Sequence, residues 1–194
     1  MLVLCAHCAS SIPFQLVGVE ADPTHFEFLK KHFRDNDVDS AAHTLINAAV
    51  SKDDGQVPFA TGHARDWYGQ CIVDRPQDFA SYGLDEVKVV TAPAISLRTL
   101  LRDVERVDLI DMDIQGAEFY VIAAAIDILN AKVRRMHIET HGKAIEDDLR
   151  PLLAGQNWEC LNDYTCASGS DTPYGRVEFE GGVQTWVNPR LAAD

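Results

Sequence analysis

The sequence has little positive charge and no long apolar run. Its 194 residues include 17 Lys and Arg against 30 Asp and Glu, for a formal net charge of -13. So acidic a chain repels phosphate backbones, which argues against nucleic acid as a partner. No stretch approaches the roughly 20 apolar residues needed to span a bilayer. The apolar start lacks a basic flank, so we do not interpret it as a signal peptide.

Cysteines are few, and their spacing does not indicate a set of disulfide bonds. There are five, an odd number scattered along the chain, which favours reduced thiols in a cytoplasmic protein. Cys5 and Cys8 have the spacing of a metal or redox pair. A zinc site needs about four ligands, however, and no second close pair exists. Because residues three apart share a helix face, we interpret Cys5 and Cys8 as packing residues and expect no metal site.

What is present is typical of one globular α/β domain over residues 1–194. Hydrophobic residues make up 46% and charged residues 24%, and apolar strands alternate with amphipathic helices. Strands are expected at 15–21, 43–51, 57–61, 87–96, 107–113, 134–141 and 158–165. Helices are expected at 22–36, 96–104, 117–130 and 144–156, the first with Asp22 as N-cap and Pro23 at its first position.

The order of these elements predicts a mostly parallel sheet with helices on both faces. Residues 176–189 contain Gly181 and Gly182 between two apolar runs and predict a closing antiparallel hairpin. Residues 62–86 have no clear period. Loops over strand ends usually set specificity, so we expect residues 62–86 and the hairpin to choose the substrate.

Three acids fall at or near the carboxyl ends of predicted strands: Glu20, Asp113 and Glu139. In such folds ligands bind beyond those ends, so we expect the three carboxylates to line one rim around a nucleoside pocket. A carboxylate at the end of the second strand can accept both hydrogens of a ribose diol. Glu20 could equally cap the following helix together with Asp22.

The segment "VDLIDMDIQGAEFYVI", residues 107–122, is the sharpest feature. Asp111 and Asp113 point to the same face of the strand, with Asp111 deeper and expected to be a hydrogen-bonded or partly protonated acid. Gly116 allows a tight turn. Glu118 lies in the first helical turn, where its charge suits the helix dipole.

The segment "HIETH" places His137, Glu139 and His141 on one face of a strand. Three such residues could bind a metal or pass a proton. A ladder of polar residues at a pocket rim would look the same.

Together these segments resemble the FkbM-type methyltransferases, a branch of the Rossmann-like enzymes that use S-adenosylmethionine. The segments that carry the resemblance, in the family's order, are "GVEADPTHFEFLKKHFRDN", "LINAAVSKDDGQVPF", "ISLRTLL", "VDLIDMDIQGAE" and "HIETH".

The resemblance implies S-adenosylmethionine as cofactor, with a hydroxyl of a small molecule or sugar as methyl acceptor. It implies two sets of site residues. The cofactor-binding set is Glu20, Asn47, Ala48, Ala49, Asp111 and Glu118, and the catalytic set is Asp113, Glu139 and His141. A homodimer remains open.

Three departures from the family pattern bear on activity. Position 111 is usually Lys and is Asp here, and position 115 is usually an acid and is Gln here. The family's first strand and its glycine-rich turn are missing, because Gly18 is the first glycine. We therefore expect an N-terminally incomplete domain, or an incomplete cofactor site.

Three functions are weighed on this basis. The first is an S-adenosylmethionine-dependent O-methyltransferase in which Asp113 or His141 serves as base. The second is a methyltransferase-like binding or interaction module without catalysis, which the departures favour. The third is a metal-dependent hydrolase built on the carboxylates and histidines.

Overall fold

The computed structural model describes residues 14–62, 69–73 and 87–191. The chain forms two compact units, which we describe one at a time. The first comprises residues up to 50 together with 54–95, and the second comprises 51–53 together with 96–194. In the described part of the chain, no helix is long and apolar enough to cross a membrane.

The first unit begins with a strand–helix–strand segment. Strand β1 (Val17–Glu20) pairs in parallel with β2 (Thr44–Asn47), and α2 (Pro23–Asp35) lies between them in sequence. The Asp22 side chain accepts hydrogen bonds from the amides of Thr24 at 2.8 Å and His25 at 3.1 Å. This confirms the predicted N-cap, which satisfies amides that have no partner inside the helix.

A four-stranded sheet completes the first unit, in the order β3-β6-β4-β5. Its strands are β3 (Ala49–Ser51), β4 (Gly55–Thr61), β5 (Cys71–Ile72) and β6 (Lys88–Ser96). The prediction of one strand over 43–51 was wrong. The chain leaves β2 at Ala48, whose amide bonds to the Glu20 carbonyl at 3.1 Å, and enters a different sheet.

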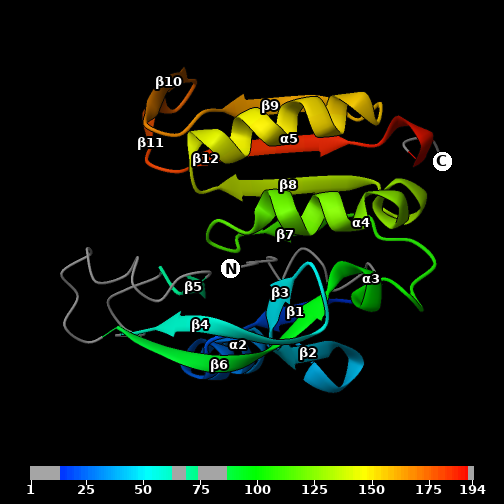
Figure 1. Ribbon diagram of the computed structural model, residues 1–194, viewed down its shortest axis with the longest axis vertical. Coiled ribbons are helices and arrows are strands. Elements are labelled where there is room, and N and C mark those ends of the chain that lie inside the picture. Colours follow the sequence, from blue (N-terminus) through cyan, green and yellow to red (C-terminus); the bar gives the residue numbers. More distant parts are fainter. Residues whose placement is uncertain (1–13, 63–68, 74–86, 192–194) are drawn as a thin grey trace. The chain divides into compact units, whose positions relative to one another are not determined.

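The second unit is built on a sheet of order β7-β8-β12-β9, with helices α4 and α5 beside each other and α5 packed on β8, β9 and β12 (Figure 1). The strands are β7 (Ile110–Met112), β8 (Arg135–Thr140), β9 (Glu159–Tyr164) and β12 (Gly182–Val187). The helices are α3 (Leu97–Leu100), α4 (Glu118–Lys132) and α5 (Lys143–Gly155). β7 and β8 are parallel, whereas β12 is antiparallel to both of its neighbours.

The core of the second unit follows from two sequence periods. In β8, Met136 and Ile138 are fully buried while Arg135, His137 and Glu139 are more exposed, as alternation along a strand requires. In α5, Leu149 and Leu153 are four apart and fully buried on one helix face. Helix α4 adds Ile122 and Leu129 to the fully buried residues.

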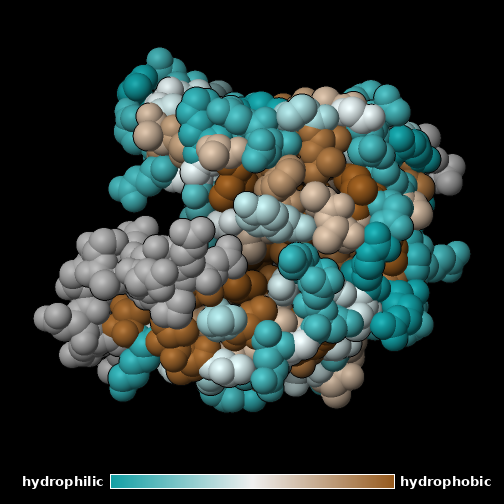
Figure 2. Space-filling model, in the orientation of Figure 1, coloured by the Kyte–Doolittle hydropathy of each residue, from teal (hydrophilic) through white to brown (hydrophobic). Residues whose placement is uncertain are grey.

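The prediction of a closing hairpin over residues 176–189 was wrong, because its two strands pair with different partners. β11 (Gly175–Phe179) pairs with β10 (Ser168–Thr172), and the two connect through Pro173 and Tyr174. β12 instead enters the sheet between β8 and β9, because Gln184, Thr185 and Trp186 are buried there. Figure 2 shows mostly hydrophilic residues over the β10–β11 end of this unit.

Candidate active site

A glutamate–histidine pair forms the centre of the site in the second unit. Glu118, the first residue of α4, has no exposed surface, and its Oε1 lies 2.9 Å from Nδ1 of His141. The same oxygen accepts the Gly116 amide at 3.0 Å. A carboxylate cannot donate, so Nδ1 carries the hydrogen of this bond and Nε2 of the neutral ring is left to accept a proton.

Asp113 lies on the other side of the imidazole. Its Oδ1 is 3.5 Å from Nε2 of His141 and accepts a 2.8 Å hydrogen bond from the Gln115 side chain. The turn between β7 and α4 brings these groups together through positive φ angles at Gln115 (52°) and Gly116 (102°). The second angle suits a residue without a side chain, which is the tight turn expected at Gly116.

The surrounding charges favour the protonated form of His141. Burial lowers the pKa of His141, but the hydrogen bond to Glu118 and the charges of Glu118, Asp113 and Glu139 outweigh that effect and raise the pKa above 6.5. The side chain keeps 21% of its surface exposed. His141 can therefore take up a proton near neutral pH while remaining accessible to a ligand.

A pocket lies beside His141. It is lined by Glu139, His141, Gly142, Cys166, Glu180 and Gly181. Glu139 and His141 come from β8 and the residue after it, whereas Cys166 and Glu180 lie at the two ends of the β10–β11 hairpin. The two ends of the β10–β11 hairpin therefore supply one wall of this pocket.

In the first unit, Glu20 lies at the end of β1, as predicted. Its Oε1 accepts the Asp22 amide at 2.7 Å, and burial raises the pKa of its carboxyl despite that bond. Asn47 donates its side-chain amide to the carbonyls of Glu20 at 2.8 Å and Ala21 at 3.1 Å. Ala48 and Ala49 are buried. Asp22 is therefore the residue that caps α2, and Glu20 holds the Asp22 backbone by accepting its amide.

The structure brings together only some of the predicted site residues. Asp113, Glu118 and His141 are in contact, with Glu139 close enough to raise the pKa of His141. His137 lies apart, since its Nδ1 is 2.9 Å from the Thr185 hydroxyl on β12. The expectation that Asp111 is deeply placed was wrong: it is exposed, on a three-residue strand at the edge of its sheet. That Glu20 joins the same rim stays a prediction.

Sequence reasoning missed Cys166, Glu180 and the buried Glu146 of α5. Cys166 follows the end of β9 by two residues and Glu180 directly follows β11, but nothing in the sequence indicates that these two strand ends meet beside His141. Glu146 looked like one more acid on an amphipathic helix. Among residues 14–62, 69–73 and 87–191, no three His, Cys, Asp or Glu side chains are arranged to hold a metal ion.

This fold is shared with Rossmann-like methyltransferases. The crystal structure of the FkbM methyltransferase from Methylobacillus flagellatus KT is similar at a TM-score of 0.55 and 12% identity, over 89% of this chain and 36% of that one. A human methyltransferase 10 domain containing protein gives a TM-score of 0.45 at 13% identity, over 94% of this chain and 68% of that one.

Residues 9–161 match the methyltransferase FkbM domain, so the chain belongs to the FkbM methyltransferase family. A putative methyltransferase from Jannaschia sp. (strain CCS1) is 25% identical over 152 residues, which are 77% of this chain and 54% of that protein. The chain thus spans about half the length of this curated relative.

Proposed function

We propose that the chain transfers a methyl group from S-adenosylmethionine to a hydroxyl of a small molecule or sugar, with His141 as the base. The observation that carries the proposal is the Glu118–His141 hydrogen bond of 2.9 Å, which leaves Nε2 of the ring to accept a proton. Membership of a methyltransferase family supplies the reaction class.

The residues present fit the cofactor. None of the described residues donates a hydrogen bond to the buried Glu118 Oε2, and a buried acceptor of this kind is costly unless a donor or a positive charge completes it. The other site carboxylates also suit a cationic ligand. When bound, S-adenosylmethionine would supply an electrophilic methyl on a sulfonium. We assign Glu20 to the ribose hydroxyls, for which a carboxylate offers two acceptor oxygens.

His141 acts on the acceptor. S-adenosylmethionine would supply the methyl group to the acceptor oxygen, and Nε2 of His141 would accept the proton that the acceptor hydroxyl loses. Glu118 stabilises the imidazolium through Nδ1, and Asp113 does so from 3.5 Å on the Nε2 side. Because a positioned base contributes about 10²–10⁴-fold to such a step, His141 is the residue whose loss should matter most.

Two measurements test this function. Calorimetric titration with S-adenosylhomocysteine should show saturable binding that Glu20→Ala weakens. Incubation with methyl-tritiated S-adenosylmethionine and a panel of sugars and hydroxylated small molecules should label at least one acceptor, and His141→Ala should lose that labelling. Saturable binding together with labelling that survives His141→Ala would remove His141 as base. No binding and no labelling by the wild-type chain would refute the function.

A further inference from the structure

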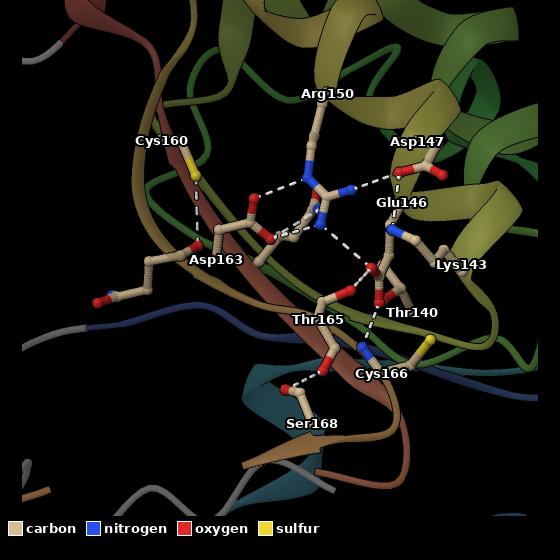
Figure 3. Close-up of polar contacts among 12 residues, drawn as sticks. Thr140, Lys143, Glu146, Asp147, Arg150, Cys160, Asp163, Thr165, Cys166 and Ser168 are labelled. Carbon is tan, nitrogen blue, oxygen red and sulfur yellow. Dashed lines mark hydrogen bonds and ion pairs between the residues drawn. The ribbon is translucent and has the colours of Figure 1, made fainter. Parts of the chain in front are cut away.

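A second buried glutamate, Glu146 of α5, lies behind the pocket. It has no exposed surface, and its carboxylate bonds to two segments outside its own helix and to one arginine within it (Figure 3). Oε1 accepts the Cys166 amide at 2.7 Å and the Thr140 hydroxyl at 3.2 Å. The Thr165 hydroxyl donates to Oε2, which also lies 3.1 Å from the Arg150 guanidinium.

Arg150 ties this carboxylate to β9. Its guanidinium donates to both oxygens of Asp163, at 2.7 and 2.9 Å, and to Asp147 at 2.8 Å (Figure 3). Burial would raise the pKa of Glu146, but the bonds from Thr165, Cys166 and Arg150 outweigh it and lower that pKa. Glu146 is therefore held as a carboxylate with all of its neighbours donating to it.

The segments that Glu146 holds are those that form the pocket. Thr140 directly precedes His141, and Cys166 is the first pocket residue of the hairpin. The opposite end of the hairpin is fixed to the same place, because the Ala167 amide bonds to the Glu180 carbonyl at 3.3 Å. The backbone at Gly182 passes so close to Glu146 and Thr140 that a Cβ there would overlap both side chains.

We propose that Glu146 is a positioning residue for the methyl acceptor: it fixes the hairpin wall formed by Cys166, Glu180 and Gly181 at a set place beside His141. This inference rests on the proposed function for the identity of the ligand. The anchoring itself is a statement about the protein alone. Acceptor choice then depends on a carboxylate that does not touch the acceptor.

Amide hydrogen exchange tests the anchoring without any ligand. In Glu146→Gln, which keeps the size of the side chain but loses its charge, amides of residues 166–181 should exchange about tenfold faster. Amides of the β8–β12 ladder should keep their rates. Thr165→Val removes one donor to the same carboxylate and should loosen the same segment by a smaller factor.

Asp147→Asn is the matched control, since it also removes a carboxylate from Arg150 on the same helix but reaches neither Thr140, Thr165 nor Cys166. It should leave exchange in residues 166–181 unchanged. Unchanged exchange in Glu146→Gln would overturn the proposal. Faster exchange spread equally over the β8–β12 ladder would also overturn it, because Glu146 would then stabilise the unit as a whole.

Binding and kinetic measurements test whether Glu146 affects the acceptor site or the cofactor site. The dissociation constant of S-adenosylhomocysteine should stay within about twofold in Glu146→Gln, whereas the KM of a labelled acceptor should rise about tenfold at unchanged kcat. Weakened S-adenosylhomocysteine binding with an unchanged acceptor KM would assign the wall to the cofactor and overturn the acceptor role. If the wild-type chain does not bind S-adenosylhomocysteine, the proposed function fails. Amide hydrogen exchange in Glu146→Gln still decides whether Glu146 anchors the hairpin.

Discussion

The second unit contains two fully buried glutamates in the first turns of neighbouring helices, and they differ in how their oxygens are used. Glu146 on α5 has donors on both oxygens, among them an arginine that is itself held by Asp163 and Asp147. Glu118 on α4 has donors on Oε1 alone, and its Oε2 is buried with no partner in the described residues.

This difference separates two uses of a buried charge. A carboxylate whose neighbours all donate to it costs little to keep ionised and holds distant segments in one arrangement. A carboxylate with an open oxygen is costly in the free protein, and a bound cation or donor can offset that cost. We therefore expect Glu146 to control stability and the pocket wall, and Glu118 to control the chemistry at His141.

The largest expected effect is on stability in Glu146→Ala. The change leaves the Thr140, Thr165 and Cys166 donors without their acceptor and removes one carboxylate from Arg150. Losing one partner of a buried, hydrogen-bonded charge network costs about 3 kcal/mol. Urea unfolding followed by circular dichroism measures it. A loss no larger than that of an exposed substitution would show that the network is not the anchor of this unit.

The next effect is on catalysis in Glu118→Gln. The amide can still accept from Gly116, but it cannot balance the charge of a protonated His141. The initial rate of methyl transfer should fall about 10²-fold, which corresponds to about 2.7 kcal/mol in activation free energy. The free energy of unfolding should change much less than in Glu146→Ala. A variant that keeps its rate but loses stability would reverse the roles of the two glutamates.

A smaller effect is the pH dependence that His141 gives to stability. Its folded pKa is raised above 6.5, so the folded state binds the proton more tightly than the unfolded state does. The resulting stabilisation is fully present below the unfolded pKa near 6.5 and is lost as pH rises through the higher folded pKa. Unfolding free energies across this window should decline with pH in the wild type.

Glu118→Gln supplies the control for that decline. With the hydrogen-bonded charge gone, only Asp113 and Glu139 oppose the effect of burial on the pKa of His141, so the slope in the same pH window should become shallower. NMR titration of the imidazole checks the same point site by site, because the resonance of His141 should titrate at lower pH in the variant. An unchanged titration would mean that Asp113 and Glu139, not Glu118, raise the pKa of His141.

Features that depend on neighbouring residues in the chain could be predicted from the sequence. Asp22 before Pro23 predicted the cap of α2, and the turn at Gly116 placed Glu118 at the start of α4 beside the strand-end acids. The ranges expected for α4, α5 and β8 lie close to their observed bounds. These features depend on residues near each other in the chain, where propensity and spacing carry most of the information.

Features set by long-range pairing could not be predicted in the same way. Gly181 and Gly182 permit a turn, but the strands on either side pair elsewhere, since β12 is buried between β8 and β9. The partner of Glu146 in the hairpin, Cys166, is 20 residues away, and nothing in the spacing links them. Asp111 was expected to be deep because the segment around it is apolar, yet it is exposed on the three-residue edge strand β7.

The smallest expected effect is on stability in Asp147→Ala, which is the control for Glu146→Ala. Asp147 bonds to the same arginine as Glu146, at 2.8 Å, but its side chain is 55% exposed. An exposed ion pair contributes about 0–1 kcal/mol and weakens with salt, so Asp147→Ala should cost under about 0.5 kcal/mol in urea unfolding and less in 0.5 M salt. If Asp147→Ala instead cost as much as Glu146→Ala, the effect of both variants would come from Arg150. The bonds to Thr140, Thr165 and Cys166 would then no longer explain why α5 carries a buried acid.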